Sequence, residues 1–195
     1  LRHNISDALA KSQARLSQAI EVSKMGLWDW DLVNDRVYQS RFMECFGKKD
    51  WCTREYIQHL KKICPHDDFT KIKQAMLSYL DGESDHYKIS FRVHDKATDS
   101  WLWVEDQGKA VKRDKEGAVL RMLGTRRDIT QERQRQEQWH LAKSVFDQTS
   151  DGIFVLDNKF RFVSVNSAFR KITGQEEADL LKKDWIDFSN PPQKA

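Results

Sequence analysis

The sequence is short of the features that mark whole classes of protein. Its 195 residues include only three cysteines, Cys45, Cys52 and Cys64, too few and too scattered for a disulfide framework. There is no run of about 18 apolar residues and no signal-like leader. The 33 basic and 30 acidic residues are mostly interleaved, so no field of one sign draws the chain to nucleic acid or to a membrane. We therefore expect a cytoplasmic segment that contacts neither.

Motifs for catalysis and metal binding are also missing. The chain has no Gly-rich phosphate loop, nucleophile elbow or zinc-helix signature. Four residues lack the paired, close spacing of a zinc site: Cys52, His59, Cys64 and His66. His59 and His66 are nominal axial ligands for haem, but a surface histidine is the commoner situation. Asp67 and Asp68 are better explained as a helix cap than as an acid–base pair. We predict a segment without catalysis and without a bound metal.

The N-terminal residues have helical spacing. Residues 1–25 are predicted to form an amphipathic helix. Its narrow, weakly apolar seam consists of Ile5, Leu9, Ser12, Leu16, Ala19 and Ser23. The seam is too short and too rich in serine for a strong coiled coil. It can dock on its own domain or on the same seam of a second chain, and the sequence leaves both possibilities open.

A strand pair follows this helix. Alternation places Trp28, Trp30 and Leu32 on one face of a strand over residues 26–32. Turn residues lead to a second strand over 36–39, so the two strands are predicted to form a hairpin.

Helices are expected in the middle of this first half. Residues 40–46 are predicted to form a short helix, and residues 53–63 a longer one. A third helix is predicted to begin near Asp67 or Asp68 and to run to Leu80.

Three more strands are predicted after these helices, over residues 87–93, 101–111 and 118–129. The last strand is apolar on both faces, which predicts a central position in the sheet with cover on both sides. The order is therefore two strands, several helices and three strands.

The second half of the chain repeats features of the first. Gly152–Asp157 has the same spacing of glycine and aspartate as Gly26–Asp31, and Gly174 stands where Gly47 stands in the first copy. The second copy stops before its later strands. We interpret the chain as part of a longer protein whose effector domain lies outside it.

These residues resemble the PAS family, in particular the subgroup whose first strand reads Gly-x-Trp-x-Trp-Asp, here Gly26–Asp31. Four further motifs match: Pro65-His66-Asp67-Asp68, residues 103–108, residues 114–117, and Gly124-Thr125-Arg126-Arg127-Asp128-Ile129-Thr130. The family usually has His-Pro where this chain has Pro65-His66, so no role of that histidine is carried over to His66.

The resemblance implies an α+β fold, in which a five-stranded antiparallel sheet carries helices across one face and is flanked by linker helices. It divides the chain into an N-terminal helix (1–25), a PAS domain (26–131), a helical connector (132–148) and the truncated start of a second PAS domain (149–195). Because the truncated domain exposes unpaired strand edges, we expect it to be disordered or to pair with another chain.

Six side chains are candidates for a ligand pocket: Trp28, Trp30, Tyr56, Met76, Phe91 and Trp103. They can instead fill a core, since large aromatic residues supply much of the burial energy of a small domain. In the family, the Asp-Ile-Thr motif ties the last strand to the linker. Asp128 and Thr130 are therefore predicted to carry the signal, with an ordinary helix cap as the alternative. No cysteine stands in the Asn-Cys-Arg-Phe motif of light-sensing flavin members, and no cofactor is assigned.

The resemblance implies a sensory module of a bacterial signalling protein, which transmits the state of a ligand or partner through flanking helices in a homodimer. Residues 144–152 resemble tandem PAS proteins that end in domains for cyclic-di-GMP synthesis or degradation, with histidine kinases as the competing effector. The alternative function is a constitutive dimerisation scaffold with a filled core and no ligand.

Overall fold

Two compact units make up the chain, Leu1–Arg133 and Gln134–Ala195. The computed structural model describes residues 11, 14, 15, 18, 19, 22, 23, 25–40 and 44–189, with residue 187 described by its backbone alone. The predicted helix over residues 1–25 therefore lies largely outside the described residues.

The first unit is built on a six-stranded antiparallel sheet in the order β3-β2-β1-β6-β5-β4. Its strands are β1 (Met25–Asp31), β2 (Arg36–Gln39), β3 (Asp50–Trp51), β4 (Tyr87–Asp95), β5 (Ser100–Arg113) and β6 (Val119–Asp128). The five predicted strands are all present, which confirms the α+β fold. β3 adds a sixth strand at the edge beside β2, and its two residues are too few to show an alternating pattern.

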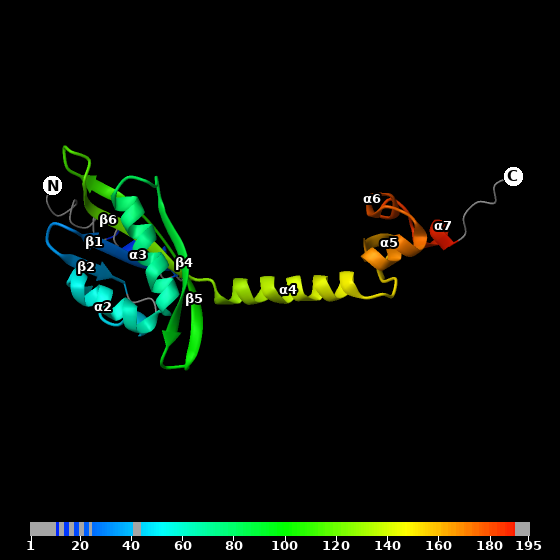
Figure 1. Ribbon diagram of the computed structural model, residues 1–195, viewed down its shortest axis with the longest axis horizontal. Coiled ribbons are helices and arrows are strands. Elements are labelled where there is room, and N and C mark those ends of the chain that lie inside the picture. The colour runs from blue at the N-terminus through cyan, green and yellow to red at the C-terminus, as the bar shows by residue number, and fades with distance from the viewer. Residues whose placement is uncertain are drawn as a thin grey trace. The chain divides into compact units, whose positions relative to one another are not determined.

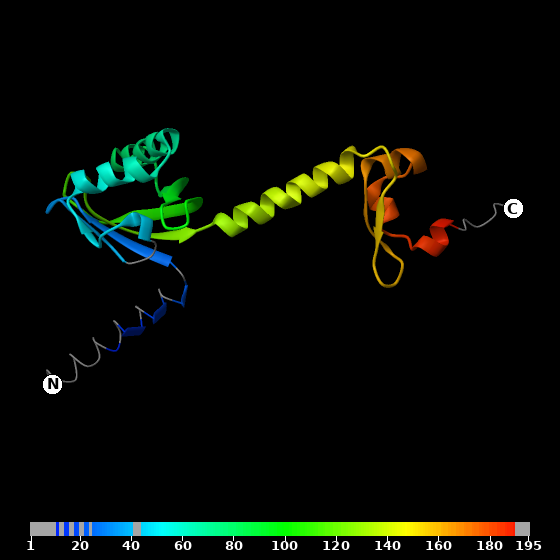
Figure 2. The same cartoon turned by 90° about the horizontal axis from the view of Figure 1, so that it is seen from below.

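Helices α2 (Thr53–Ile63) and α3 (His66–Leu80) cross one face of this sheet, as the two ribbon views show (Figure 1, Figure 2). A short 3-10 helix, η1 (Glu44–Phe46), occupies part of the helix predicted over 40–46, of which residues 41–43 lie outside the described part. The apolar core between helices and sheet contains Phe46, Leu60, Ile63, Ile72, Phe91, Val93 and Val104.

The start of α3 differs from the prediction. Its N-cap residue is Pro65, and no side chain caps the helix. Asp68 instead reaches across to β4, where its carboxylate accepts hydrogen bonds from the backbone N–H and the Nε of Arg92 at 2.9 and 2.8 Å. The predicted capping role of Asp67 or Asp68 is therefore wrong, because a charge-assisted contact with another element takes the carboxylate.

Strand β6 lies between β1 and β5, which confirms its predicted central position. Met122 and Arg126 point to the helix-covered face and are buried. On the other face Leu123 is 42% exposed, so the prediction that both faces are covered is wrong for this residue. Apolar residues on both faces of a strand do not show by themselves that both faces are covered.

Helix α4 (Thr130–Gln148) begins at the end of β6 and continues into the second unit. The rest of that unit consists of β7 (Phe154–Leu156), β8 (Phe162–Val165), α5 (Ser167–Thr173), α6 (Glu177–Leu180) and α7 (Trp185–Ser189). Its core contains Phe162, Val165, Phe169 and Leu180. The prediction of disorder after residue 150 is therefore wrong for the described residues. The sheet has only two strands, and pairing with another chain stays a prediction.

Candidate functional site

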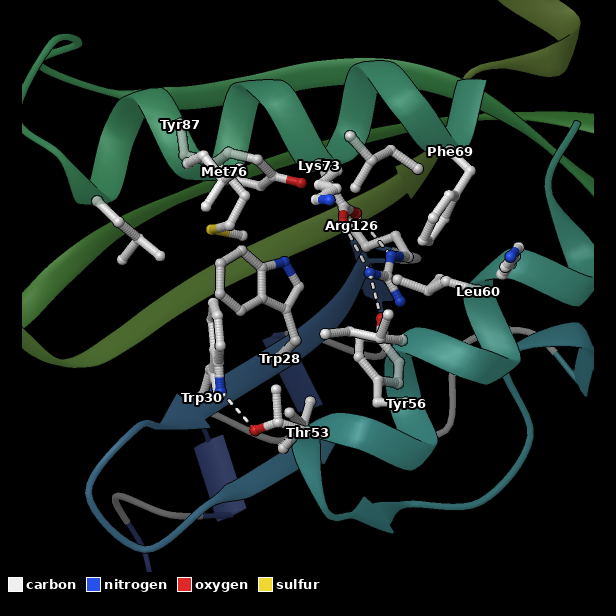
Figure 3. A pocket seen from close by; sticks show the side chains of 17 residues that line it. Trp28, Trp30, Thr53, Tyr56, Leu60, Phe69, Lys73, Met76, Tyr87 and Arg126 are labelled. Atoms are coloured by element: carbon white, nitrogen blue, oxygen red, sulfur yellow. Dashed lines mark hydrogen bonds and ion pairs between the residues drawn. The ribbon is translucent and has the colours of Figure 1, made fainter. Parts of the chain in front are cut away.

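A cavity of about 420 Å³ lies in the first unit, between the sheet and helices α2 and α3 (Figure 3). Its size falls within the range of small-molecule pockets, about 300 to 1,000 Å³. The wall is mostly apolar, and its larger members are Trp28, Trp30, Tyr56, Leu60, Phe69, Ile72, Met76, Leu80 and Tyr87. The arrangement suits a small molecule with an apolar body.

Four of the six predicted pocket residues line this cavity: Trp28, Trp30, Tyr56 and Met76. Phe91 does not, because it is 1% exposed inside the neighbouring apolar core. Trp103 does not either. Its neighbour on β5, Val104, is fully buried on the inner face, and alternation along a strand turns Trp103 to the opposite face.

Two glycines give Trp28 its place against the sheet. Gly108 on β5 and Gly124 on β6 are register partners, and Gly124 also pairs with Trp28 of β1. A Cβ atom on Gly124 would lie 2.2 Å from Cζ2 of the indole, and one on Gly108 would lie 2.4 Å from its Cη2. The bare backbone therefore leaves room for the ring. Nε1 of Trp28 is buried and has no hydrogen-bond partner among the described residues.

Trp30 and Tyr87 are held in the cavity wall by contacts with neighbouring side chains. Nε1 of Trp30 donates to Oγ1 of Thr53 at 3.0 Å, which joins β1 to the first residue of α2. Tyr87 meets the indole of Trp28 edge to face, with ring centres 5.9 Å apart and planes at 82°. Lys61 on α2 and Lys73 on α3 also line the cavity, and both are exposed.

A buried ion pair borders the cavity. Arg126 on β6 donates from Nε and Nη2 to the carboxylate of Asp106 on β5, at 2.5 and 2.6 Å. Nη2 also donates to the hydroxyl of Tyr56 at 2.8 Å, and Nη1 donates to Oε1 of Gln39 at 3.3 Å. The guanidinium lies 3.8 Å from the ring centre of Phe46. These contacts join three strands, η1 and α2 through one side chain.

The electrostatics of this group are set by burial and by the ion pair. Burial works against the charge of Arg126, but the charge of Asp106 and the contact with Tyr56 outweigh it and raise the pKa of the guanidinium. Burial also raises the pKa of the Tyr56 hydroxyl. The sequence analysis missed the pair. Alternation along β6 places Met122, Gly124 and Arg126 on the inner face, which was a signal for a buried arginine. That Asp106 lies opposite Arg126 follows only from the register of β5 against β6, which the sequence does not show.

The predicted signal residues stand where β6 becomes α4. Oδ1 of Asp128 accepts a hydrogen bond from the backbone N–H of Thr130 at 2.8 Å. Oγ1 of Thr130 accepts one from the backbone N–H of Trp103 at 2.8 Å, which ties the first residue of α4 to β5. Arg133, one turn along the helix, lies 4.8 Å from the ring centre of Trp103. The indole therefore packs against the first turn of α4.

Trp103 also contacts a residue that leads back to the cavity helices. The guanidinium of Arg92 on β4 lies 5.6 Å from the centre of its ring. Arg92 is the partner of Asp68 on α3, and its hydrogen bond lowers the pKa of that carboxyl. A continuous series of contacts thus connects α3 with the first turn of α4.

The histidines and cysteines within the described ranges form no comparable cluster. Nε2 of His59 lies 2.8 Å from the carbonyl oxygen of Cys45, and its ring lies 4.9 Å from that of Trp51. Burial raises the pKa of Cys45 to about 11 and that of Cys64 to about 12. The described residues contain no group of three or more His, Cys, Asp or Glu that could hold a metal ion.

Comparisons with known proteins agree with the fold. A family model described as "PAS fold" matches residues 38–126, and one described as "PAS domain" matches residues 134–194. No helix in the described part of the chain is long and apolar enough to cross a membrane.

A curated relative is the "Non-motile and phage-resistance protein" of Caulobacter vibrioides, which is 26% identical over 174 residues. The match covers 85% of this chain but only 20% of the relative, so the chain spans about a fifth of that protein's length.

Two solved structures are similar to the chain. A sensory box histidine kinase/response regulator from Burkholderia thailandensis superposes with a TM-score of 0.54 at 20% identity, over 69% of this chain and 99% of the other. The N-terminal domain of a diguanylate cyclase with a PAS/PAC sensor from Marinobacter aquaeolei gives a TM-score of 0.44 at 16% identity, over 56% and 98%. The first supports the fold, and the second score is too low to support an argument.

The antiparallel sheet with helices across one face agrees with the two tandem family matches, and the chain belongs to the PAS family.

Proposed function

We propose that the chain is a sensory module of a multidomain bacterial signal-transduction protein, in which a ligand or partner state changes the flanking helices and so regulates an effector. The observation that carries this proposal is the position of Arg126. It lines the cavity, and it lies on the same strand as Asp128, two residues before the motif that holds the start of α4.

Two routes lead from the cavity to α4. One follows β6 from Arg126 to Asp128 and Thr130. The other runs from α3 through the Asp68–Arg92 ion pair to the ring of Trp103, on which Arg133 of α4 packs. A ligand that favours one arrangement of the cavity wall would shift the population of helix states through either route.

The proposal includes a homodimer formed through the flanking helices. Apolar side chains of α4 are exposed in the single chain, Trp139 at 58%, Leu141 at 68% and Val145 at 63%. Leu141 and Val145 lie four residues apart on one face of α4, and a second copy of the chain would cover that face. We place the module in the cytoplasm. A cyclic-di-GMP synthesising or degrading domain is the favoured effector and a histidine kinase the next.

A dimerisation scaffold without a ligand is the alternative, and the apolar core beside the cavity is the observation that favours it. Native mass spectrometry and an absorption scan of protein purified without denaturation separate the two. A retained small molecule, lost when Met76→Trp fills the cavity, supports a sensor. A dimer that retains nothing and binds nothing in a metabolite screen supports a scaffold.

Asp128→Ala tests the link to α4. The change removes the acceptor for the Thr130 amide, so it should uncouple the effector in the complete parent protein while it lowers stability by only about 1 kcal/mol. Asp114→Ala is the matched control, since Asp114 makes similar hydrogen bonds to backbone amides in the β5–β6 turn. Effector activity assayed with and without ligand decides the matter. Equal regulation in wild type and Asp128→Ala would disprove the role.

A further inference from the structure

The hydroxyl of Tyr87 has no partner in the cavity wall. Tyr87 is 2% exposed and lines the cavity, yet its hydroxyl makes no hydrogen bond with any residue that the structure describes. Figure 3 shows the side chain extending from the sheet into the space beneath α3. A phenylalanine would make the same ring contact with Trp28, so the hydroxyl adds only a polar atom that opens onto the cavity and has no partner in the described protein. The hydroxyl is therefore free to form a hydrogen bond with a molecule in the cavity.

The polar groups around Tyr87 are mostly donors. The Tyr56 hydroxyl accepts from Arg126 and keeps its own proton for donation. Arg126 and Asp106 neutralise each other, so the inner part of the cavity offers no net charge. Burial, reinforced by the charge of Asp106, raises the pKa of Tyr87 well above its usual value and keeps the hydroxyl protonated. The inner end of the cavity thus suits a neutral oxygen acceptor.

The mouth of the cavity has the opposite character. Lys61 on α2 and Lys73 on α3 line it from two facing helices, and neither forms an ion pair with a described residue. Two unpaired ammonium groups favour an anion at this end. The rest of the wall is mostly apolar and includes Leu60, Ile72 and Met76.

We propose, on the basis of the sensory role above, that the cavity binds an organic acid with two separated polar ends. Its carboxylate lies at Lys61 and Lys73, its apolar body lies along α2 and α3, and a carbonyl oxygen at the far end accepts a hydrogen bond from Tyr87. Tyr87 is thus a specificity-determining residue of the site.

Three probes of one length test this assignment by titration calorimetry on the chain of 195 residues. They are 7-oxooctanoate, which has both ends, octanoate, which lacks the carbonyl, and 2-octanone, which lacks the carboxylate. The keto acid should bind about tenfold more tightly than octanoate, the usual effect of one buried hydrogen bond. Tyr87→Phe should remove this difference, leave octanoate binding unchanged and leave the fold intact, because no bond within the protein is lost.

Tyr79→Phe is the matched control for that substitution. The Tyr79 hydroxyl accepts from the backbone N–H of Ala110 at 2.6 Å, and Tyr79 does not line the cavity. Tyr79→Phe should lower the melting temperature, because this hydrogen bond is lost, and should keep the preference for the keto acid. Tyr87→Phe should leave the melting temperature unchanged and remove the preference for the keto acid.

The double variant Lys61→Gln, Lys73→Gln tests the other end. It should weaken both acids about fivefold, in a salt-dependent way, without an effect on 2-octanone. Lys62→Gln, on the same helix but outside the cavity lining, is its control.

Two results would overturn the assignment: keto-acid binding by Tyr87→Phe equal to that of wild type, or equal weakening of acids and ketone by the lysine variant. If none of the probes binds while a different molecule is retained in the cavity, the ligand class is wrong and the sensory role stands. If no probe binds and no molecule is retained, both proposals fail.

Discussion

Replacement of Asp106 by asparagine removes the counter-charge of a deeply buried cation. The side chains of Asp106 and Arg126 are each only 5% exposed, and two charge-assisted hydrogen bonds join them. Loss of one partner of a buried pair typically costs about 3 to 5 kcal/mol, since the other charge stays in a medium of low polarity. Asparagine keeps the shape and one acceptor oxygen, so we expect the lower end, about 3 kcal/mol. That is a large share of the stability of an ordinary domain, about 5 to 15 kcal/mol.

The assay is urea unfolding, with amide hydrogen exchange of β5 and β6 to report on the first unit alone. Asp29→Asn serves as the control, because its partner Arg121 is 49% exposed and an open pair contributes about 1 kcal/mol or less. Arg126→Met combined with Asp106→Asn completes a double-mutant cycle, and the double variant should be much less unstable than the sum of the two single variants. Additive losses, or a loss under about 1 kcal/mol for Asp106→Asn, would refute the reasoning.

Two further substitutions test packing and acid stability. Gly124→Ala should lower the free energy of unfolding by about 3 kcal/mol, because the new methyl group would lie 2.2 Å from the indole of Trp28. Gly117→Ala, at φ +92° with open space around it, should lower it by only about 1 kcal/mol. Equal melting temperatures of the two variants in circular dichroism would contradict this difference. The hydrogen bond from Arg92 lowers the pKa of Asp68 in the folded protein. The ion pair therefore stabilises the fold fully above the pKa of Asp68 in the unfolded chain, about 4. This stabilisation is lost as the pH falls through the lower pKa of the folded protein. Asp68→Asn should therefore lower the free energy of unfolding by about 1 kcal/mol at neutral pH. Below about pH 4, the free energy of unfolding of the variant should fall less steeply with pH than that of wild type. An acid-unfolding curve identical to that of wild type counts against the ion pair.

Local patterns were enough to predict most of the first unit. The alternation around Trp28 and Trp30 indicates β1, and helical spacing gives α2 with the bounds that the structure has. β3 could not be predicted in this way, because it is held by its pairing with β2 and not by a pattern of its own. The disorder predicted for the second unit was wrong because aromatic residues such as Phe154 and Trp185, whose rings stack 4.7 Å apart, give even the short unit a core.

The site was predicted less completely than the fold. Four of the six predicted pocket residues, on β1, α2 and α3, line the cavity. Phe91 lies in the neighbouring core and Trp103 lies on the opposite face of β5, because composition alone does not show which face of a strand a residue occupies. The ion pair of Asp106 with Arg126 and the free hydroxyl of Tyr87 depend on register across strands. Such contacts join residues far apart in sequence, and a single sequence contains no direct signal for them.

The hydroxyl of Thr130 anchors the first residue of α4 to β5. Each residue of an α-helix turns the direction of the next side chain by about 100°. One residue inserted after this anchor would redirect every later side chain of α4 by that angle, whereas seven inserted residues, close to two full turns, would nearly restore the original directions. The number of residues between Thr130 and Trp139 therefore determines the direction in which the Trp139 side chain points around the helix axis, as well as its distance along the helix.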